Sequence, residues 1–208
     1  MNPALHEETT SDGVRIRIYQ DPDATSPFDW DLLGTLYSDR RKGLGYHKDI
    51  RSFDYLEDFI GDLCIDYGIN TELIISLESR VEALKWKFPV LVPVKFDKGY
   101  VCSFEEAPLE RANGIWLVTQ AELDEAAIGA VPGYECVQGH IQAIDEWLRG
   151  NVYGYVVALD GEKDSCWGFY PGEHGEYEYC LGEAREAAKN LAQRIARDES
   201  ECRACMAL

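Results

Sequence analysis

Apolar and polar positions follow two periods along this chain, and together they predict an α+β fold. Apolar and basic residues alternate over 14–19, as in a half-buried strand, whereas apolar residues recur every three or four positions over 52–67, as in a helix. Further strands are predicted at 32–37, 88–96, 100–104, 114–118, 152–159 and 165–170, and further helices at 71–85, 119–128, 134–149 and 182–197. Because strands and helices come in blocks, we expect an α+β protein with a mixed or antiparallel sheet of about five to seven strands and about five helices packed on it.

Local signals mark the ends of some of these elements. Pro89 and Pro93 lack a backbone N–H, so the strand at 88–96 is expected at the edge of a sheet. Thr119 and Glu122 have the spacing of a capping box, which predicts the start of a helix. Residues 1–12 and 201–208 are expected to form flexible tails, and residues 13–200 a single domain, with a sub-boundary near 105–113 as the alternative.

The balance of charge narrows the classes of partner. The 208 residues carry 38 Asp and Glu against 20 Lys and Arg, a formal net charge of -18. This charge argues against direct binding to nucleic acid or to an anionic membrane, and it favours a basic protein surface as the partner. No signal peptide, membrane span or disulfide framework is visible in the sequence, so we expect a cytoplasmic protein with reduced thiols.

The acidic residues are clustered rather than spread evenly. On the helix predicted over 52–67, aspartates recur at every fourth position with one glutamate beside them: Asp54, Glu57, Asp58, Asp62 and Asp66. Like charges four residues apart on a helix repel by about 0.2–0.5 kcal/mol per pair, and no Lys or Arg lies between Arg51 and Arg80 to relieve them. A second acidic group lies in the segment 112–148, which has no Lys or Arg: Glu122, Asp124 and Glu125.

Two interpretations of these acids stay open. An acidic solvated face keeps many proteins soluble, and the row over 54–66 on its own favours this interpretation. Alternatively, the carboxylates imitate a nucleic-acid backbone. That requires several acidic segments on one surface, because one helix carries such charges about 6 Å apart, whereas duplex DNA carries one charge per about 1.7 Å.

Candidate chemistry is sparse in this sequence. Cys202 and Cys205 form a CxxC pair, but a closed zinc site needs four ligands, and no second CxxC or HxxxH pair joins Cys166, Cys180 or His174 to them. We therefore expect no bound metal and no cofactor. The chain has no nucleophile elbow, phosphate-binding loop or dinucleotide fingerprint. The sequence favours a protein without catalytic activity, and an enzyme with a scattered site is the less favoured alternative.

Three stretches of the chain resemble a known group of proteins. They are RIRIYQDPDATSPFDWDLLGTLYSDRRKGLGY, NVYGYVVALDGEKDSCWGFYPG and EAREAA, which are similar to segments of a family of small, mostly uncharacterised acidic proteins encoded by phages, plasmids and other mobile elements. In the middle of the chain VPVKFDKGYV, with Phe96 and Asp97, stands where the family carries an apolar-Tyr-Asp segment with Gly. The resemblance implies an accessory protein that acts inside a bacterial cell, and it implies no particular chemistry.

The charge pattern and the resemblance together lead to one hypothesis about function. The protein would act as a DNA mimic, an antirestriction or anti-CRISPR inhibitor that occupies the basic nucleic-acid groove of a host defence complex. The two acidic groups named above would supply the partner-binding residues. A regulatory or scaffold protein that binds a basic partner without blocking nucleic acid is the main alternative.

Overall fold

The computed structural model describes residues 3–39, 51–98, 102–171 and 176–206, and the chain forms two compact units. Residues 1–25 and 150–208 form one unit, which we call the terminal unit, and residues 26–149 form the other, the central unit. The single domain expected over 13–200 is therefore divided, at 25/26 and 149/150 rather than near 105–113. The reason is that strands from the two ends of the sequence pair with each other.

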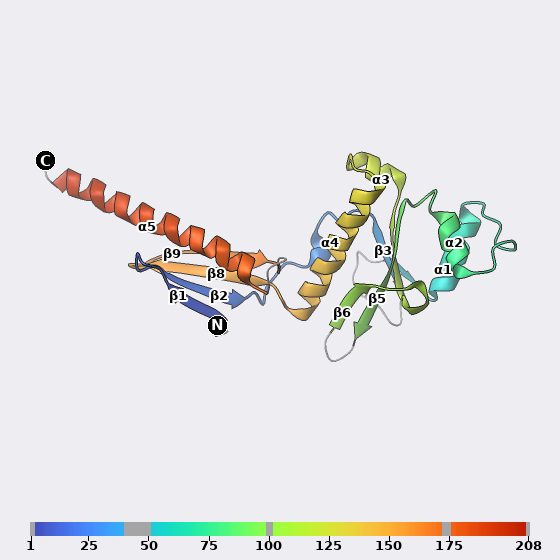
Figure 1. Cartoon of the computed structure of the whole chain (residues 1–208), viewed down its shortest axis with the longest axis horizontal. Helices are drawn as coiled ribbons and strands as arrows, with labels where there is room; N and C mark the ends of the chain where they lie inside the picture. Colours follow the sequence, from blue (N-terminus) through green and yellow to red (C-terminus); the bar gives the residue numbers. More distant parts are fainter. Residues whose placement is uncertain (1–2, 40–50, 99–101, 172–175, 207–208) are drawn as a thin grey trace. The chain divides into compact units, whose positions relative to one another are not determined.

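The terminal unit is an antiparallel four-stranded sheet, in the order β1-β2-β8-β9, with one long helix along it (Figure 1). Its elements are β1 (His6–Thr9), β2 (Arg15–Gln20), β8 (Tyr153–Leu159), β9 (Glu162–Phe169) and α5 (Glu178–Met206). Ile16 and Ile18 of β2 and Val157 of β8 are fully buried in one core with Ala184 and Ala188 of α5. The small alanine side chains let the helix pack closely on the sheet, and the residues between the buried ones face away from it.

Secondary structure extends into both segments that were expected to be flexible tails. β1 forms within 1–12 because it pairs with β2, and Arg185 of α5 donates two hydrogen bonds of 2.8 Å to the Glu8 carboxylate. At the other end α5 continues to Met206, because no Gly or Pro follows Gly182 to stop it. Residues 6–9 are thus stabilised by contacts with β2 and α5, and residues 201–206 continue a helix that begins before them.

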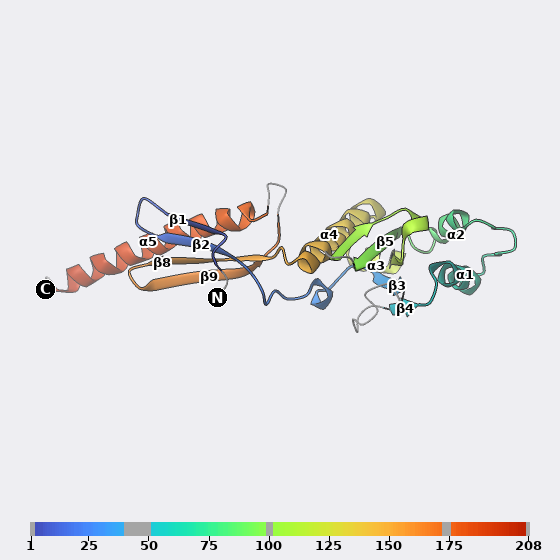
Figure 2. The ribbon, with the colours of Figure 1, turned by 90° about the horizontal axis from the view of Figure 1, so that it is seen from below.

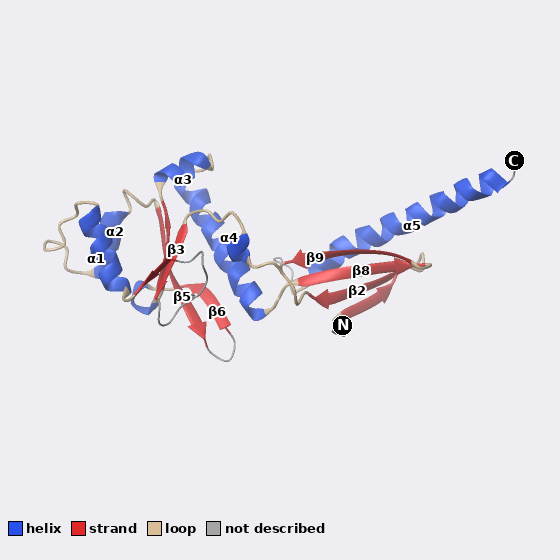
Figure 3. Ribbon diagram, turned by 180° about the vertical axis from the view of Figure 1, so that it is seen from behind, coloured by secondary structure: helices blue, strands red, loops and turns tan. Residues whose placement is uncertain are grey.

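The central unit has three layers, a five-stranded sheet between two layers of helices (Figure 3). Its strands are β3 (Thr35–Asp39), β4 (Arg51–Phe53), β5 (Val90–Lys98), β6 (Cys102–Glu106) and β7 (Gly114–Val118), in the order β4-β3-β7-β5-β6. Its helices are α1 (Leu56–Asp66), α2 (Leu77–Leu84), α3 (Gln120–Glu125) and α4 (Ala130–Arg149), with 3-10 turns at Pro27–Asp29 and Leu109–Arg111. β3 and β4 pair in parallel, and the other pairs are antiparallel.

Strand β7 is buried along its whole length because helices cover both faces of the sheet. Trp116 and Val118 belong to the core beneath α4, whereas Ile115 and Leu117 belong to the core beneath α1 and α2. Alternation along a strand thus divides one apolar run between two cores. The predicted α+β class and the five helices are confirmed. The described residues form nine strands in two sheets, where one sheet of about five to seven strands was expected.

Strand β5 lies between β7 and β6, so the edge position predicted from its prolines was wrong. In a strand, the N and C=O of one residue point to the same side. The carbonyl of Pro93 accepts a hydrogen bond from Ala107 N at 3.1 Å, and Ala107 is one residue beyond the end of β6. The nitrogen of Pro93 points to the same side, so its missing N–H lies where the pairing of β5 with β6 already ends. The strands predicted at 88–96 and 100–104 correspond to β5 and β6, which pair antiparallel, and residues 99–101 lie outside the described part of the chain.

Capping chemistry decides where the helices begin. Thr119 and Glu122 form the predicted capping box at the start of α3. Helix α2 starts at Leu77, later than predicted, with the Ser76 hydroxyl accepting from the backbone N–H of Ser79 at 3.2 Å. Helix α4 starts at Ala130, earlier than predicted, because Pro132 falls in its first turn, where no N–H is required.

Candidate protein-binding surface

Helix α1 carries the acidic row, and its apolar side determines which residues face outward. Ile60 and Cys64 are fully buried, and the Phe59 ring stacks on Phe53 with 5.0 Å between the ring centroids. These contacts leave four acids exposed on the remaining surface of the helix: Glu57, Asp58, Asp62 and Asp66. The outward position of the helical row is therefore as the sequence predicted.

Asp54 is exposed, but it does not belong to the helical row. The chain forms strand β4 through Phe53, and α1 begins only at Leu56, with Tyr55 as its N-cap. Pairing of β4 with β3 overrides the helical period at this point, so the helix is shorter than the one predicted over 52–67. The row on α1 has three aspartates and two like-charged pairs, one pair fewer than the sequence suggested.

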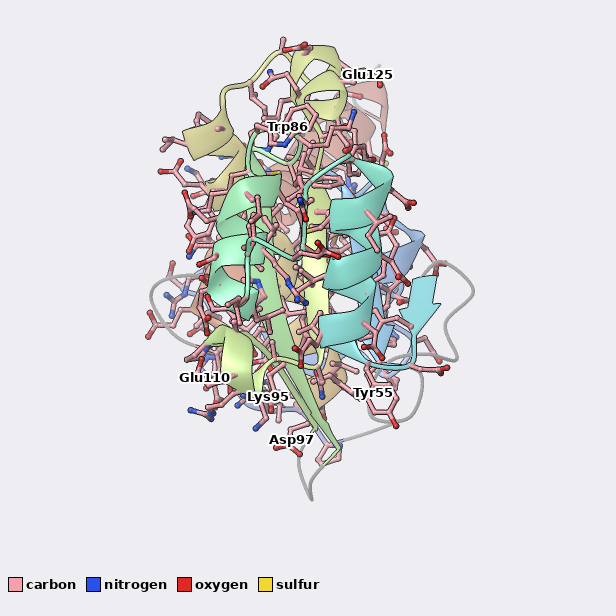
Figure 4. The ribbon with its side chains drawn as sticks, turned by 90° about the vertical axis from the view of Figure 1, so that its right-hand side faces the viewer. Tyr55, Trp86, Lys95, Asp97, Glu110 and Glu125 are labelled. Atoms are coloured by element: carbon pink, nitrogen blue, oxygen red, sulfur yellow. The ribbon has the colours of Figure 1, made fainter. Side chains whose placement is uncertain are left out.

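Helix α2 packs beside α1 and adds acids to the same layer (Figure 4). Eight acidic side chains between 54 and 84 are exposed: Asp54, Glu57, Asp58, Asp62, Asp66, Glu72, Glu78 and Glu82. Arg80 is the one Lys or Arg in this stretch of sequence. Its guanidinium lies beside Gly61 of α1, and its Nε donates a hydrogen bond to Ile74 O at 3.1 Å. The layer is therefore negative, with Arg80 between its two helices and two lysines just after α2: Lys85 pairs with Glu82 at 2.6 Å, and Lys87 lies over the Tyr67 ring.

Large apolar side chains are exposed in this layer too. Half of the ten exposed large hydrophobic residues in the described chain lie here: Tyr55, Ile65, Leu73, Ile75 and Trp86. Leu73 and Ile75, between α1 and α2, are 80% and 87% exposed. Trp86 follows α2 and is 66% exposed, with its ring edge-on to the Tyr67 ring at 6.3 Å (Figure 4). Large contiguous apolar patches mark contact surfaces, whereas single exposed side chains are normal, so five such residues in one layer make it a candidate contact surface. We call these five residues and the eight acids the α1–α2 surface.

The second predicted acidic group serves the local structure of α3. The Glu122 carboxylate accepts hydrogen bonds from Thr119 N at 2.7 Å and Thr119 Oγ1 at 2.8 Å, so it closes the capping box. Asp124 accepts from Gln120 Nε2 at 2.7 Å, and Glu125 is exposed (Figure 4). Two of the three carboxylates are thus engaged in contacts within their own helix.

The two acidic groups belong to different layers of the central unit. Leu123 of α3 is buried in the core beneath α4, whereas Ile60 of α1 is buried in the core on the other face of the sheet. The segments predicted to converge therefore cover opposite faces of one sheet. The exposed apolar residues beside the α1 row were not predicted, although Leu73, Ile75 and Trp86 in a charged stretch of sequence were the available signal.

Cys136 and His140 form a polar cluster that the sequence analysis did not identify, although their spacing of four on a helix was a signal. His140 Nε2 accepts from Leu33 N at 3.3 Å and lies 3.4 Å from Cys136 Sγ. The imidazole stacks on Trp116, whose Nε1 donates to Leu33 O at 2.8 Å. Burial lowers the pKa of His140, which favours the neutral ring. A nucleophilic cysteine needs a cationic or proton-accepting neighbour, and this nitrogen already accepts a backbone N–H. The cluster fits a structural role at Leu33.

The cysteines offer no assembled metal site in the part of the chain described. Cys202 is exposed on α5, whereas the side chain of Cys205 and all of His174 lie outside the described residues. Cys180 is buried beneath the terminal-unit sheet, and burial raises the pKa of its thiol to about 12. Among the described residues, no group of three or more His, Cys, Asp or Glu side chains is arranged to hold a metal ion.

Comparisons with protein-family models, curated proteins and solved structures find no match for this chain. No site can be transferred from a relative, so the function is argued from the residues themselves. None of the helices described combines the length and apolar character needed to cross a bilayer. The chain is therefore an acidic α+β protein of two units. One helical layer of its central unit exposes both apolar and negatively charged side chains.

Proposed function

We propose that this protein is a non-catalytic binding protein whose α1–α2 surface attaches to a basic surface of another protein. The proposal rests on one observation: eight exposed carboxylates and five exposed large apolar side chains lie in one layer of the central unit. Carboxylates steer a basic partner and select it, while apolar and aromatic anchors supply much of the binding energy. A face that served solubility alone would not need Leu73, Ile75 and Trp86 exposed.

The partner we propose is a nucleic-acid-binding groove of a host defence complex, either a restriction enzyme or a CRISPR effector. Asp58, Asp62 and Asp66 rise along α1 by about 6 Å per step, and Glu78 and Glu82 repeat that spacing on α2. Packed helices lie about 8–10 Å apart, so the layer offers Lys and Arg side chains two lines of carboxylates. The resemblance to proteins of mobile elements supports a defence target inside a bacterial cell, where the protein would act as an inhibitor and DNA mimic.

The acids of α3 play a smaller part in this proposal than the sequence suggested. Glu122 and Asp124 accept hydrogen bonds within α3, and α3 lies in the layer on the far side of the sheet from α1. A groove that encloses only the α1–α2 surface leaves these residues outside the contact. Their replacement is therefore a test of local stability rather than of binding.

A second function is favoured by the apolar residues. Phosphate groups carry no apolar surface, so a pure DNA mimic would have little use for the exposed side chains of Ile65, Leu73 and Ile75. A regulatory or scaffold protein that binds a basic partner away from any nucleic-acid site would use both the acids and the apolar groups. The two functions differ in one respect: only the DNA mimic competes with nucleic acid.

The experiment is capture of partners from a bacterial lysate at low salt, followed by titration of the purified partner. A triple variant with Asp58, Asp62 and Asp66 changed to Asn should bind roughly 1,000-fold or more weakly, because each of three desolvated charge pairs contributes about 1.5 kcal/mol or more. A matched control changes three exposed acids of the terminal unit, Glu176, Glu183 and Glu201, to Gln and should bind as the parent does. Equal losses in both variants would contradict the proposed surface.

Competition with duplex DNA separates the two functions. If the captured partner is a nuclease or effector complex and duplex DNA displaces the protein from it, the DNA-mimic function is supported. If the partner binds the protein and DNA simultaneously, the scaffold or regulatory function is supported instead. Capture that is unchanged by Leu73→Ala and Trp86→Ala would show that the apolar part of the surface is not used.

A further inference from the structure

The sheet of the terminal unit has a helix on one face only. Ile16 and Ile18 of β2 face α5, whereas Arg15, Arg17 and Tyr19 alternate with them and face the other way. In Figure 2 the four strands lie in front of α5, on the side that it does not cover. No described helix of the terminal unit covers this side, which we call the open face.

Strand register arranges the open face in three rows across β2, β8 and β9. The rows are Arg15–Ala158–Lys163, Arg17–Val156–Ser165 and Tyr19–Gly154–Trp167. The central strand β8 contributes Ala158, Val156 and Gly154. Long side chains flank it on both sides in the first and third rows, and on the β2 side alone in the middle row, where β9 contributes Ser165. The result is a trough along β8, and three rows two residues apart span about 14 Å.

Cations border one end of this trough. A hollow of about 340 Å³ lies there, between Arg15 on β2 and Lys163 on β9, with Ala158 at its floor and Asp160 and Thr9 among its other lining residues. The small side chain of Ala158 leaves this space open between two positive charges. Both cations are exposed, so they are accessible to an anionic group in the trough.

Arg17 stands in the middle row. Its Nη2 donates to Glu7 Oε1 at 3.2 Å, and the same oxygen lies 3.8 Å from Arg15 Nε, so one carboxylate is shared between two guanidinium groups. The Nε of Arg17 is buried and has no hydrogen-bond partner. In a chain where Asp and Glu outnumber Lys and Arg by 38 to 20, this face has Arg15, Arg17 and Lys163 against Glu7 and Asp160, and the Asp21 carboxylate accepts a hydrogen bond from Gly168 N at 3.2 Å beside Trp167.

An exposed indole occupies the other end of the trough. Trp167 is 45% exposed, and its ring lies flat over Gly154, where any Cβ would collide with it. Gly168, with φ +83°, and a register shift at Tyr153/Gly154 place Trp167 on the open face while Phe169 packs with the core beneath α5. The bulge thus presents one aromatic face to solvent although the core does not require it.

We propose that the open face binds single-stranded nucleic acid, with phosphates over Arg15, Arg17 and Lys163 and one base stacked on Trp167. A line of cations with an aromatic platform is the combination that single strands use, because unpaired bases are free to stack. A duplex keeps its bases stacked internally, and a peptide of Asp and Glu alone has no ring to place on the indole. This function lies in the terminal unit and is independent of the function proposed for the α1–α2 surface.

The net charge of the chain does not exclude this site. Exposed charges farther apart than about 8–10 Å are largely screened at physiological ionic strength, so a phosphate in the trough responds mainly to the groups that border it. The expectation of no direct nucleic-acid binding was drawn from the sum over all 208 residues. That sum contains no information on how the strands group the few cations.

Fluorescence anisotropy of a labelled oligothymidine of about 12 nucleotides, at physiological ionic strength, tests the proposal. Trp167→Ala should weaken binding roughly 5- to 150-fold, the range of one lost base stack, and Trp167→Phe should keep most of the affinity. Trp30→Ala, which removes a tryptophan of the central unit that is 41% exposed against 45% for Trp167, is the matched control and should leave the affinity unchanged.

A second pair of variants tests the cations. Changing Arg15 and Lys163 to Gln should weaken binding and reduce the slope of log affinity against log salt by roughly 1.4, because two phosphate contacts are lost. The control changes two cations of α5, Lys189 and Arg194, to Gln and should leave the slope unchanged. If Trp167→Ala does not fold, as judged by circular dichroism, the proposal is tested by Trp167→Phe and by the variant in which Arg15 and Lys163 are changed to Gln.

Four outcomes would overturn the proposal. The first is absence of binding by the parent protein, and the second is an equal loss in the Trp30 and Trp167 variants. The third is binding of polyglutamate as tight as that of the oligonucleotide with the same dependence on Trp167, which would assign the face to acidic peptides. Preference for duplex over single-stranded DNA would also contradict a stacking platform.

Discussion

Replacement of Asp62 by Asn tests whether the acidic row weakens the fold that carries it. Asp62 is four residues from both Asp58 and Asp66 on α1, so this one substitution removes both like-charged pairs of the row. Each pair costs about 0.2–0.5 kcal/mol, so the free energy of unfolding should rise by about 0.4–1 kcal/mol at low salt. Asn and Asp have similar helix propensities, so propensity contributes little to the difference.

The other two aspartates provide graded controls. Asp58→Asn removes one repulsive pair, but it also removes a negative charge from the first turn, where the helix dipole stabilises it by about 0.3–1 kcal/mol, so the two effects should nearly cancel. Asp66→Asn removes one pair and a negative charge from the last turn, where the dipole opposes it, so its gain should match that of Asp62→Asn. The expected order of stability is therefore Asp62→Asn equal to Asp66→Asn, and both above Asp58→Asn.

Urea denaturation at two salt concentrations measures these differences. The Debye length is about 30 Å at 0.01 M salt and about 3 Å at 1 M, shorter than the separation of neighbours four residues apart on a helix. The gain of Asp62→Asn should therefore be present at low salt and absent at high salt. A loss of stability on Asp62→Asn, or a gain that persists at 1 M salt, would refute the reasoning. The row would then be a source of favourable contacts, with Arg80 as the first candidate partner.

Three further predictions concern local stability, pH and metal. Thr119→Ala should lower the free energy of unfolding by about 0.5–2 kcal/mol in urea denaturation because α3 loses its cap, while Glu122→Gln should keep the capping box and most of the stability. The hydrogen bonds from Arg185 lower the pKa of Glu8 from 4.5 to about 2, so this pair stabilises the fold fully above pH 4.5 and progressively less as the pH falls toward 2; Arg185→Gln should flatten that part of the stability profile. Elemental analysis should find no stoichiometric zinc, and one zinc per chain that Cys202→Ser removes would contradict this.

Features set by near neighbours in the sequence were predictable. The strand at 114–118 and the capping box at Thr119 and Glu122 appear in the structure as predicted, because their patterns depend on residues within a few positions. The same holds for the outward side of α1, since a period of 3.6 residues places Asp58, Asp62 and Asp66 away from Ile60 and Cys64. The acidic row on α1 therefore follows from the sequence.

Features set by distant neighbours were decided by the tertiary structure. Asp54 lies outside the helical row because β4 pairs with β3, and Pro93 lies inside a sheet because β6 ends beside it. Glu122 and Asp62 lie on opposite sides of the sheet because Leu123 and Ile60 pack into different cores. Helical and strand periods specify which side of an element is buried, but not against which other element.

The division into two units has the same origin. Strand β2 pairs with β8, Ile18 opposite Tyr155, and this pairing brings together segments separated by the whole central unit. The pairing of β2 with β8, together with that of β8 with β9, also places Arg15, Ala158 and Lys163 in one row. These three residues share no local pattern in the sequence. The sequence by itself determined most of the elements, their buried sides and the excess of negative charge, but not β1 or β4. The tertiary structure decided which charges and apolar groups share a surface, because strand register and core packing depend on contacts between residues far apart in the chain.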